Sequence, residues 1–107
     1  DVVQRFVDAS IVGWTTYLHG DNSAGNALIR ADNPDMSEAR IAAGIAAMKA
    51  YGIVESGDAE TGGIGCITAA RQAAFYDAMV KAGIAPPGLD ISAAYTTRFV
   101  CKGVGRN

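Results

Sequence analysis

The segment from Tyr51 to Arg71 most constrains what this chain can fold into, because it places a glycine-dense loop between two stretches whose apolar residues recur at helical spacing. The loop contains Gly57, Gly62, Gly63 and Gly65. Glycine adopts positive φ without steric cost and lets another backbone approach closely. Thr68 then offers a side-chain oxygen as the N-cap of a helix that begins near Ala69. We therefore expect a tight loop, shaped for contact, that leads directly into a helix.

The length of 107 residues fits one domain with a modest core. The formal net charge is -2, and the nine Lys and Arg residues are scattered, so the chain offers no basic surface for neutralising phosphates. Nucleic acid is therefore not an expected partner. No apolar run approaches the roughly 20 residues that a membrane-spanning helix needs. The chain begins at Asp1 and enters a helical pattern almost at once, which suggests a processed product or a fragment.

The periodicity of apolar residues predicts four helices. The first runs from near Val2 to His19, and the second, capped by Asp21 or Asn22, ends near Arg30. The third is capped by Asp35 or Ser37 and carries Ile41, Ile45 and Met48 on one face. The fourth spans about Ala69 to Ala82. Because no stretch alternates with period two for long enough to require a strand, the isolated chain is expected to be mainly α.

The third and fourth helices share one kind of ending. Gly52 and Gly83 each follow a helix and are themselves followed by isoleucine. This pattern predicts Schellman caps, in which the isoleucine folds back onto a methionine one turn earlier. Beyond the fourth helix, we expect a short helical or irregular segment over Leu89 to Val100 and a frayed tail from Lys102 to Asn107.

Side chains that could carry chemistry are few. His19 is the single histidine, and no carboxylates are grouped at ligand spacing, so the sequence predicts no metal site and no cofactor. The serines lack a nucleophile-elbow context, and we do not expect an enzyme. The run from Gly62 to Gly65 could cradle an anion at a helix N-terminus, yet nearby Asp58 and Glu60 would repel phosphate. A sharp turn between two helices is the favoured interpretation of this run.

The two cysteines, Cys66 and Cys101, leave two alternatives open. In an oxidising compartment they could form one disulfide that joins the central loop to the C-terminal tail. The favoured alternative is that each packs as a small apolar side chain.

Two further expectations concern packing and charge. Trp14 and Phe75 lie on helical stripes that need burial, so we expect them in the core rather than against a ligand. Arg71 lies in the first turn of its helix, where the dipole disfavours a positive charge. A salt bridge or hydrogen bond back to Asp58 or Glu60 would explain its place, the alternative being a solvated side chain.

Several segments, taken in order, resemble the C-terminal third of the ABC-transporter substrate-binding proteins related to thiamine-pyrimidine-precursor receptors. The resemblance spans nearly all 107 residues, and its specificity lies in the ordered set rather than in any single piece. The set comprises Gly13-Trp14, Asn33-Pro34-Asp35-Met36, Gly57-Asp58-Ala59, Gly65 to Thr68 with Arg71, and Ala94-Tyr95-Thr96 with Phe99-Val100.

The resemblance implies a type II periplasmic binding protein, with two α/β lobes around a cleft, located in the periplasm or on the cell-envelope exterior. Residues 1–107 would be its C-terminal helical segment, a fragment of a longer chain. The receptor would capture a small solute of the pyrimidine or thiamine-precursor, nitrate, sulfonate or taurine type and deliver it to a membrane permease. Its partners would be that solute, the permease and the remainder of its own chain.

Within such a receptor, Asp58 and Thr61 are the ligand-binding residues that we predict, because the loop glycines permit close contact and these polar groups could orient a ligand. The alternative function, from a different class, is a stand-alone helical interaction module that buries its apolar stripes against a second copy as a homodimer.

Overall fold

The computed structural model describes residues 1–106, and this part of the chain is helical without strands. The elements, in order, are α1 (Val2–His19), α2 (Ser23–Asp32), α3 (Glu38–Ala50), α4 (Asp58–Gly62), α5 (Ala69–Lys81) and the short 3-10 helix η1 (Ile91–Ala93). The expectation of a mainly α segment is therefore confirmed.

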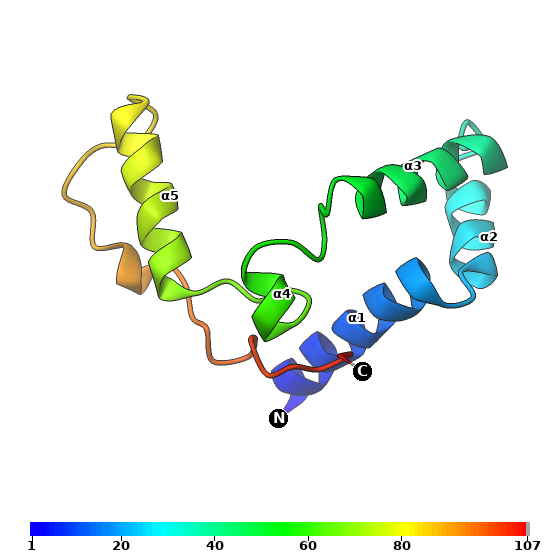
Figure 1. Ribbon diagram of the computed structural model, residues 1–107, viewed down its shortest axis with the longest axis horizontal. Helices are drawn as coiled ribbons and strands as arrows, with labels where there is room; N and C mark the ends of the chain where they lie inside the picture. The colour runs from blue at the N-terminus through cyan, green and yellow to red at the C-terminus, as the bar shows by residue number, and fades with distance from the viewer. Residues whose placement is uncertain (107) are drawn as a thin grey trace.

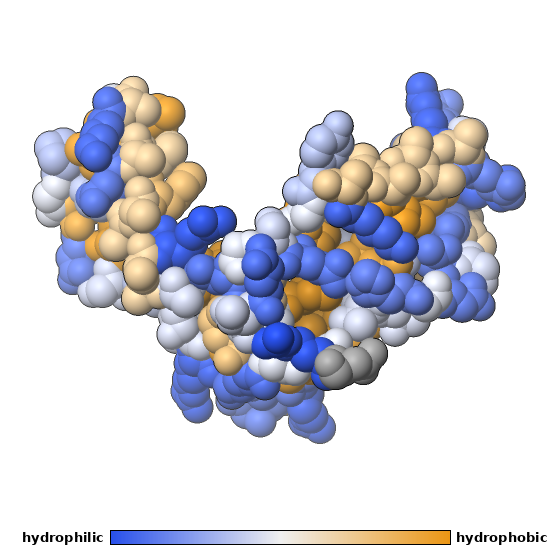
Figure 2. Space-filling view, viewed as in Figure 1, coloured by the Kyte–Doolittle hydropathy of each residue, from blue (hydrophilic) through white to orange (hydrophobic). Residues whose placement is uncertain are grey.

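The helices form two arms that meet at the short helix α4 (Figure 1). In one arm α1, α2 and α3 follow one another in a U, and α5 forms the other arm with η1 at its side. The C-terminal tail returns past α4 to α1, so both ends of the described chain lie at the base. The space-filling view shows a deep hollow between the arms (Figure 2).

Local capping rules account for the helix starts. Side-chain oxygens of Asp1, Ser37 and Thr68 accept hydrogen bonds from amides of the first turns of α1, α3 and α5. Ser37, not Asp35, is thus the cap of α3. Asn22 occupies the N-cap position of α2 without a side-chain capping bond, and α2 continues two residues past the predicted end at Arg30.

The hydrogen bonds of both predicted Schellman caps are present, while Ile53 and Ile84 themselves stay largely exposed. After α3 the amide of Ile53 donates to the Met48 carbonyl at 3.0 Å, and Gly52, with φ of 59°, donates to Lys49 at 3.2 Å. After α5 the same pair of bonds recurs around Gly83, whose φ is 70°. The glycine after each helix was sufficient to predict these C-terminal caps, because their hydrogen bonds join residues that are close in sequence.

Two expectations about irregular segments were wrong. The glycine-dense loop contains the helix α4, which is flanked by the N-cap Gly57 and the C-cap Gly63, both with positive φ. The tail is not frayed over residues 102–106, because Gly103 donates to the Gly62 carbonyl at 3.1 Å and Lys102 bonds the side chain of Gln4 on α1. Asn107 lies outside the described residues.

The buried apolar core is very small. Within residues 1–106 it comprises Ile11, Leu18, Ile41 and Cys66. Trp14 and Phe75, which the sequence assigned to the core, are 43% and 61% exposed, so that assignment was wrong. The two arms diverge, so neighbouring elements contribute only open clefts beside these side chains, with Ile29 and Met48 near Trp14 and Ile53 near Phe75.

The overall dimensions agree with this open packing. A compact domain of this length has a radius of gyration of about 13 Å, whereas this chain has 16.7 Å. A folded monomer of 11.0 kDa exposes about 5,600 Å², whereas this chain exposes 7437 Å². The chain therefore exposes an excess of about 1,800 Å² relative to a compact monomer.

Candidate functional site

The junction between the arms is organised by Asp58, the first residue of α4. Its Oδ2 accepts hydrogen bonds from the Thr68 amide at 2.8 Å and from the Thr68 hydroxyl at 2.9 Å. The amide bond and then the hydroxyl bond lower the pKa of the Asp58 carboxyl below its ordinary value of 3.8, and the positive charge of Arg71 lowers this pKa further. Asp58 thus ties the start of α4 to the start of α5.

Arg71 lies against the backbone of Gly57 rather than in an ion pair. A Cβ at Gly57 would lie 3.0 Å from Nη2 of Arg71, so glycine is required there both for its φ of 65° and for this contact. Glu60 instead accepts a hydrogen bond from the Gly57 amide at 3.1 Å. Among residues 1–106, Arg71 makes neither the salt bridge nor the hydrogen bond to Asp58 or Glu60 that we expected, although its charge acts on Asp58.

An open cleft of about 490 Å³ adjoins this junction. We call it the Arg71 cleft, and its lining combines polar side chains with partly exposed apolar ones. The lining residues are Ile53, Val54, Ser56, Asp58, Ala59, Gly65, Cys66, Ile67, Arg71, Gln72 and Phe75. The guanidinium and the amide of Gln72 can donate hydrogen bonds, while Phe75 supplies an aromatic wall. The arrangement suits a small molecule that bears acceptor atoms and one apolar face.

The structure separates the two residues that the sequence proposed as ligand contacts. Asp58 lines the Arg71 cleft, whereas Thr61 lines none of the clefts described for residues 1–106. The Thr61 hydroxyl donates to the Asp58 carbonyl at 3.5 Å, and its own carbonyl accepts a bond from Arg106. Ligand binding by Asp58 or Thr61 stays a prediction. Arg71 was not among the proposed ligand contacts, because its position in the first turn of a helix suggested only an interaction with a nearby carboxylate.

The two cysteines are joined by a disulfide, Cys66–Cys101. Of the two alternatives that the sequence left open, the favoured one, unpaired packing, was wrong. Cys66 is nonetheless buried, at 7% exposed, beside Gly62, where any Cβ would collide with its Sγ at 2.2 Å. The bridge ties the C-terminal tail to the loop that follows α4.

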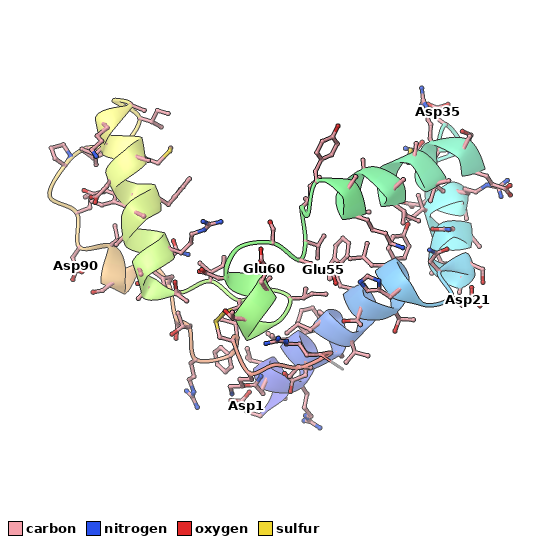
Figure 3. All side chains as sticks on the ribbon, viewed as in Figure 1. Asp1, Asp21, Asp35, Glu55, Glu60 and Asp90 are labelled. Atoms are coloured by element: carbon pink, nitrogen blue, oxygen red, sulfur yellow. A yellow bond between two sulfur atoms is a disulfide. The ribbon has the colours of Figure 1, made fainter. Side chains whose placement is uncertain are left out.

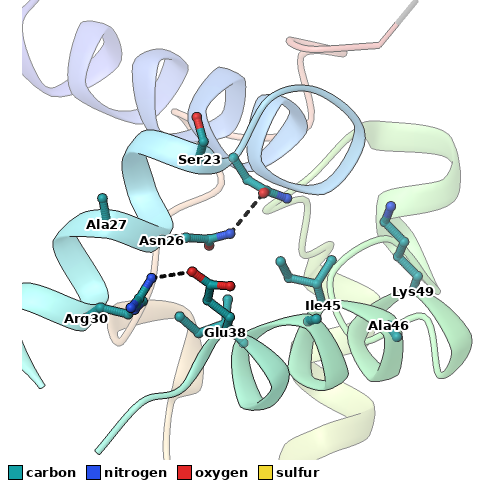
Figure 4. A pocket seen from close by; sticks show the side chains of 11 residues that line it. Ser23, Asn26, Ala27, Arg30, Glu38, Ile45, Ala46 and Lys49 are labelled. Carbon is teal, nitrogen blue, oxygen red and sulfur yellow. Dashed lines mark hydrogen bonds and ion pairs between the residues drawn. The ribbon is translucent and has the colours of Figure 1, made fainter. Parts of the chain in front are cut away.

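A larger cleft, of about 640 Å³, lies between α2 and α3 (Figure 4). Its apolar floor includes Ile45 and Ala46, and an ion pair between Arg30 and Glu38 spans one end at 2.5 Å. Because Arg30 and Glu38 neutralise each other, the cleft presents little net charge at that end. No pattern in the sequence predicted this cleft, because it depends on the angle between two helices.

His19 pairs with Glu55 at 2.7 Å, which links the end of α1 to the loop after α3. The labelled acidic side chains are otherwise spread over the whole molecule (Figure 3). In the part of the chain that the structure describes, no three His, Cys, Asp or Glu side chains are grouped so that they could hold a metal ion. Over the same residues, no helix has both the length and the apolar character needed to cross a membrane.

Comparisons with known proteins add no assignment, since no family model, curated protein or solved structure matches the chain.

Proposed function

We propose that residues 1–107 are the C-terminal helical segment of a two-lobed α/β solute receptor that delivers a small molecule to an ABC permease outside the cytoplasm. The proposal starts from the ordered sequence resemblance. The observation that carries it is the excess of about 1,800 Å² of exposed surface, because a segment that packs on the lobes of a longer chain has to present such surface. The disulfide agrees with an oxidising compartment.

In this proposal the Arg71 cleft faces the solute or the hinge between the lobes. Arg71 and Gln72 would orient acceptor atoms, and Phe75 would cover the apolar side of the ligand. Closure of the lobes would follow from a higher affinity of the solute for the closed state than for the open one. The segment itself performs no covalent chemistry and needs no cofactor.

The test begins with the intact mass and N-terminal sequence of the product of the native gene. The proposal expects a longer protein that carries this segment at its C-terminus. That protein is then screened by thermal unfolding against pyrimidines, nitrate, sulfonates and taurine, where a ligand at 100 times its Kd adds about 2.7 kcal/mol of stability. Arg71→Ala should reduce the shift, with Arg40→Ala, on exposed α3, as the control. A native product that begins near Asp1 would contradict the proposal.

The alternative function, a stand-alone helical interaction module, is favoured by the same exposed apolar surface. It differs in one measurable respect, because the module requires the isolated chain to fold and to associate stably without any lobe. A native product of 107 residues that unfolds cooperatively would establish this alternative.

A further inference from the structure

The two charged side chains that line the Arg71 cleft interact electrostatically without forming an ion pair. The positive charge of Arg71 acts on the carboxyl of Asp58, yet the salt bridges among residues 1–106 include neither side chain. In the cleft between α2 and α3, by contrast, Arg30 and Glu38 pair directly at 2.5 Å. The Arg71 cleft therefore presents one cation and one anion that direct contact does not neutralise.

Separate contacts hold these two groups apart. Oδ2 of Asp58 accepts from the Thr68 amide at 2.8 Å and from the Thr68 hydroxyl at 2.9 Å. The guanidinium of Arg71 lies against Gly57, where the absence of a Cβ leaves room for it. Within residues 1–106, neither Oδ1 of Asp58 nor the guanidinium of Arg71 takes part in a hydrogen bond. The fold thus positions both groups and leaves each able to bond a ligand.

An apolar wall lies beside the two charges. Ile53, Ile67 and Phe75 line the same cleft, and all three side chains remain exposed. The cleft volume of about 490 Å³ lies within the range of sites that hold small molecules. A ligand that fills the cleft would cover this apolar surface as well as both charged groups.

We propose that the Arg71 cleft binds a small zwitterion that carries a carboxylate, an ammonium group and an apolar side chain, as leucine does. The planar carboxylate matches the fork of N–H donors on Arg71. The ammonium group donates to Oδ1 of Asp58, and the side chain lies against Phe75. The inference rests on the proposed function, because it names the chemical class of the solute that the receptor would capture.

The charges of the cleft distinguish this class from the other candidate solutes. Nitrate would pair with Arg71 but would leave Asp58 without a cation and the apolar wall in water. An uncharged pyrimidine would displace water from both charged groups without supplying an opposite charge to either, which is costly. Taurine would supply both charges, but it has no side chain to cover Phe75. A zwitterion with an apolar side chain is complementary to all three parts of the lining.

The first experiment compares ligands by isothermal titration calorimetry on the native gene product that contains residues 1–107. Leucine should bind, and four probes each lack part of it: isocaproate lacks the ammonium group, isopentylamine lacks the carboxylate, taurine lacks the side chain, and nitrate lacks both the ammonium group and the side chain. We expect isocaproate and isopentylamine to bind at least about tenfold more weakly than leucine, because each leaves one charged group of the cleft unpaired. Taurine and nitrate should also bind more weakly.

The second experiment assigns the carboxylate to Arg71. Arg71→Gln should weaken leucine binding by about tenfold and should leave isopentylamine binding unchanged, since isopentylamine has no carboxylate to lose. A purely structural role of Arg71 would weaken both ligands equally. Arg40→Gln makes the same substitution on exposed α3 and should change neither affinity.

Three results would overturn the inference: no binding of leucine, equal affinities for leucine and isocaproate, or an equal effect of Arg71→Gln on leucine and isopentylamine. If a longer native product binds another solute instead, the receptor proposal stands and this inference fails. If a native product that begins near Asp1 binds leucine with the expected pattern, the zwitterion site stands and the receptor proposal fails.

Discussion

At the scale of single residues, the junction depends on groups that perform two tasks each. Asp58 accepts two bonds from Thr68 and so joins α4 to α5, while the Thr68 oxygen also caps α5 by accepting from the Arg71 amide at 3.2 Å. Gly57 supplies a positive φ and leaves room for the Arg71 guanidinium. The sequence identified Thr68 as a cap from local spacing alone, whereas the bond to Asp58, ten residues earlier, needed the folded loop.

The lowered pKa of Asp58 predicts how its contribution changes with pH. Because the carboxyl is more acidic in the folded chain than in the unfolded chain, its ionised form stabilises the fold at pH values above its ordinary pKa of 3.8. That contribution is lost as the pH falls from 3.8 through the lowered folded-state value. Asp58→Ala should therefore destabilise the protein near neutral pH and have a much smaller effect once the pH falls below the lowered folded-state pKa of Asp58.

Urea unfolding of the wild type and of Asp58→Ala, followed by circular dichroism across this range, measures the difference. Thr68→Ser retains both the amide donor and the hydroxyl donor, so it should reproduce the wild-type profile as a control. A difference in unfolding free energy that stays constant with pH would show that the ionised carboxylate is not the stabilising species.

At the scale of elements, the two Schellman caps use the same bonds in different surroundings. A Cβ at Gly83 would meet nothing within 4 Å, whereas one at Gly52 would lie 3.0 Å from the Cβ of Ser56. Left-handed backbone costs a non-glycine residue about 1–2 kcal/mol. Gly83→Ala should therefore cost about that amount, and Gly52→Ala should cost more because a steric contact adds to it.

Thermal or urea unfolding of the two variants tests the order of these effects. Gly44→Ala supplies the control, since Gly44 lies within α3 with open space around it and alanine favours a helix by about 1 kcal/mol. This variant should be more stable than the wild type. Equal costs at Gly52 and Gly83 would show that the loop around Ser56 relaxes freely.

At the scale of the whole molecule, few buried side chains hold the arms together, so the disulfide has a large share in stability. It spans a sequence separation of 35 residues, which includes all of α5 and η1. The loss of chain entropy from closing such a loop in the unfolded state corresponds to about 4 kcal/mol. Marginal domains have total stabilities of only about 5 kcal/mol.

Reduction, or the double substitution of Cys66 and Cys101 by serine, should therefore lower the free energy of unfolding by about 4 kcal/mol. We expect the reduced chain to lose much of its protection from hydrogen exchange in residues 99–106, where the tail lies on α1 and α4. Exchange measured by mass spectrometry on both redox forms checks this. Unchanged protection of the tail after reduction would mean that the Gly103 and Lys102 bonds hold it without the bridge.

The sequence alone determined the features whose causes lie within a few residues. Caps, glycine stops and apolar spacing predicted α1, α3 and α5 and both Schellman motifs, because hydrogen bonds between near neighbours decide them. The prediction that Trp14 and Phe75 are buried was wrong. An apolar stripe shows that a helix face favours burial, but it does not show which surface covers that face.

Only the tertiary structure decided what is joined across long stretches of chain. The pairing of Cys66 with Cys101, the return of the tail to Gly62, and the meeting of Trp14 with Ile29 and Met48 depend on the angles between helices. The angles between helices follow from how the helices pack in three dimensions, and the spacing of residues along the sequence does not specify them. The Arg71 cleft, to which the proposed function gives a role beside the solute or the hinge, belongs to this second class.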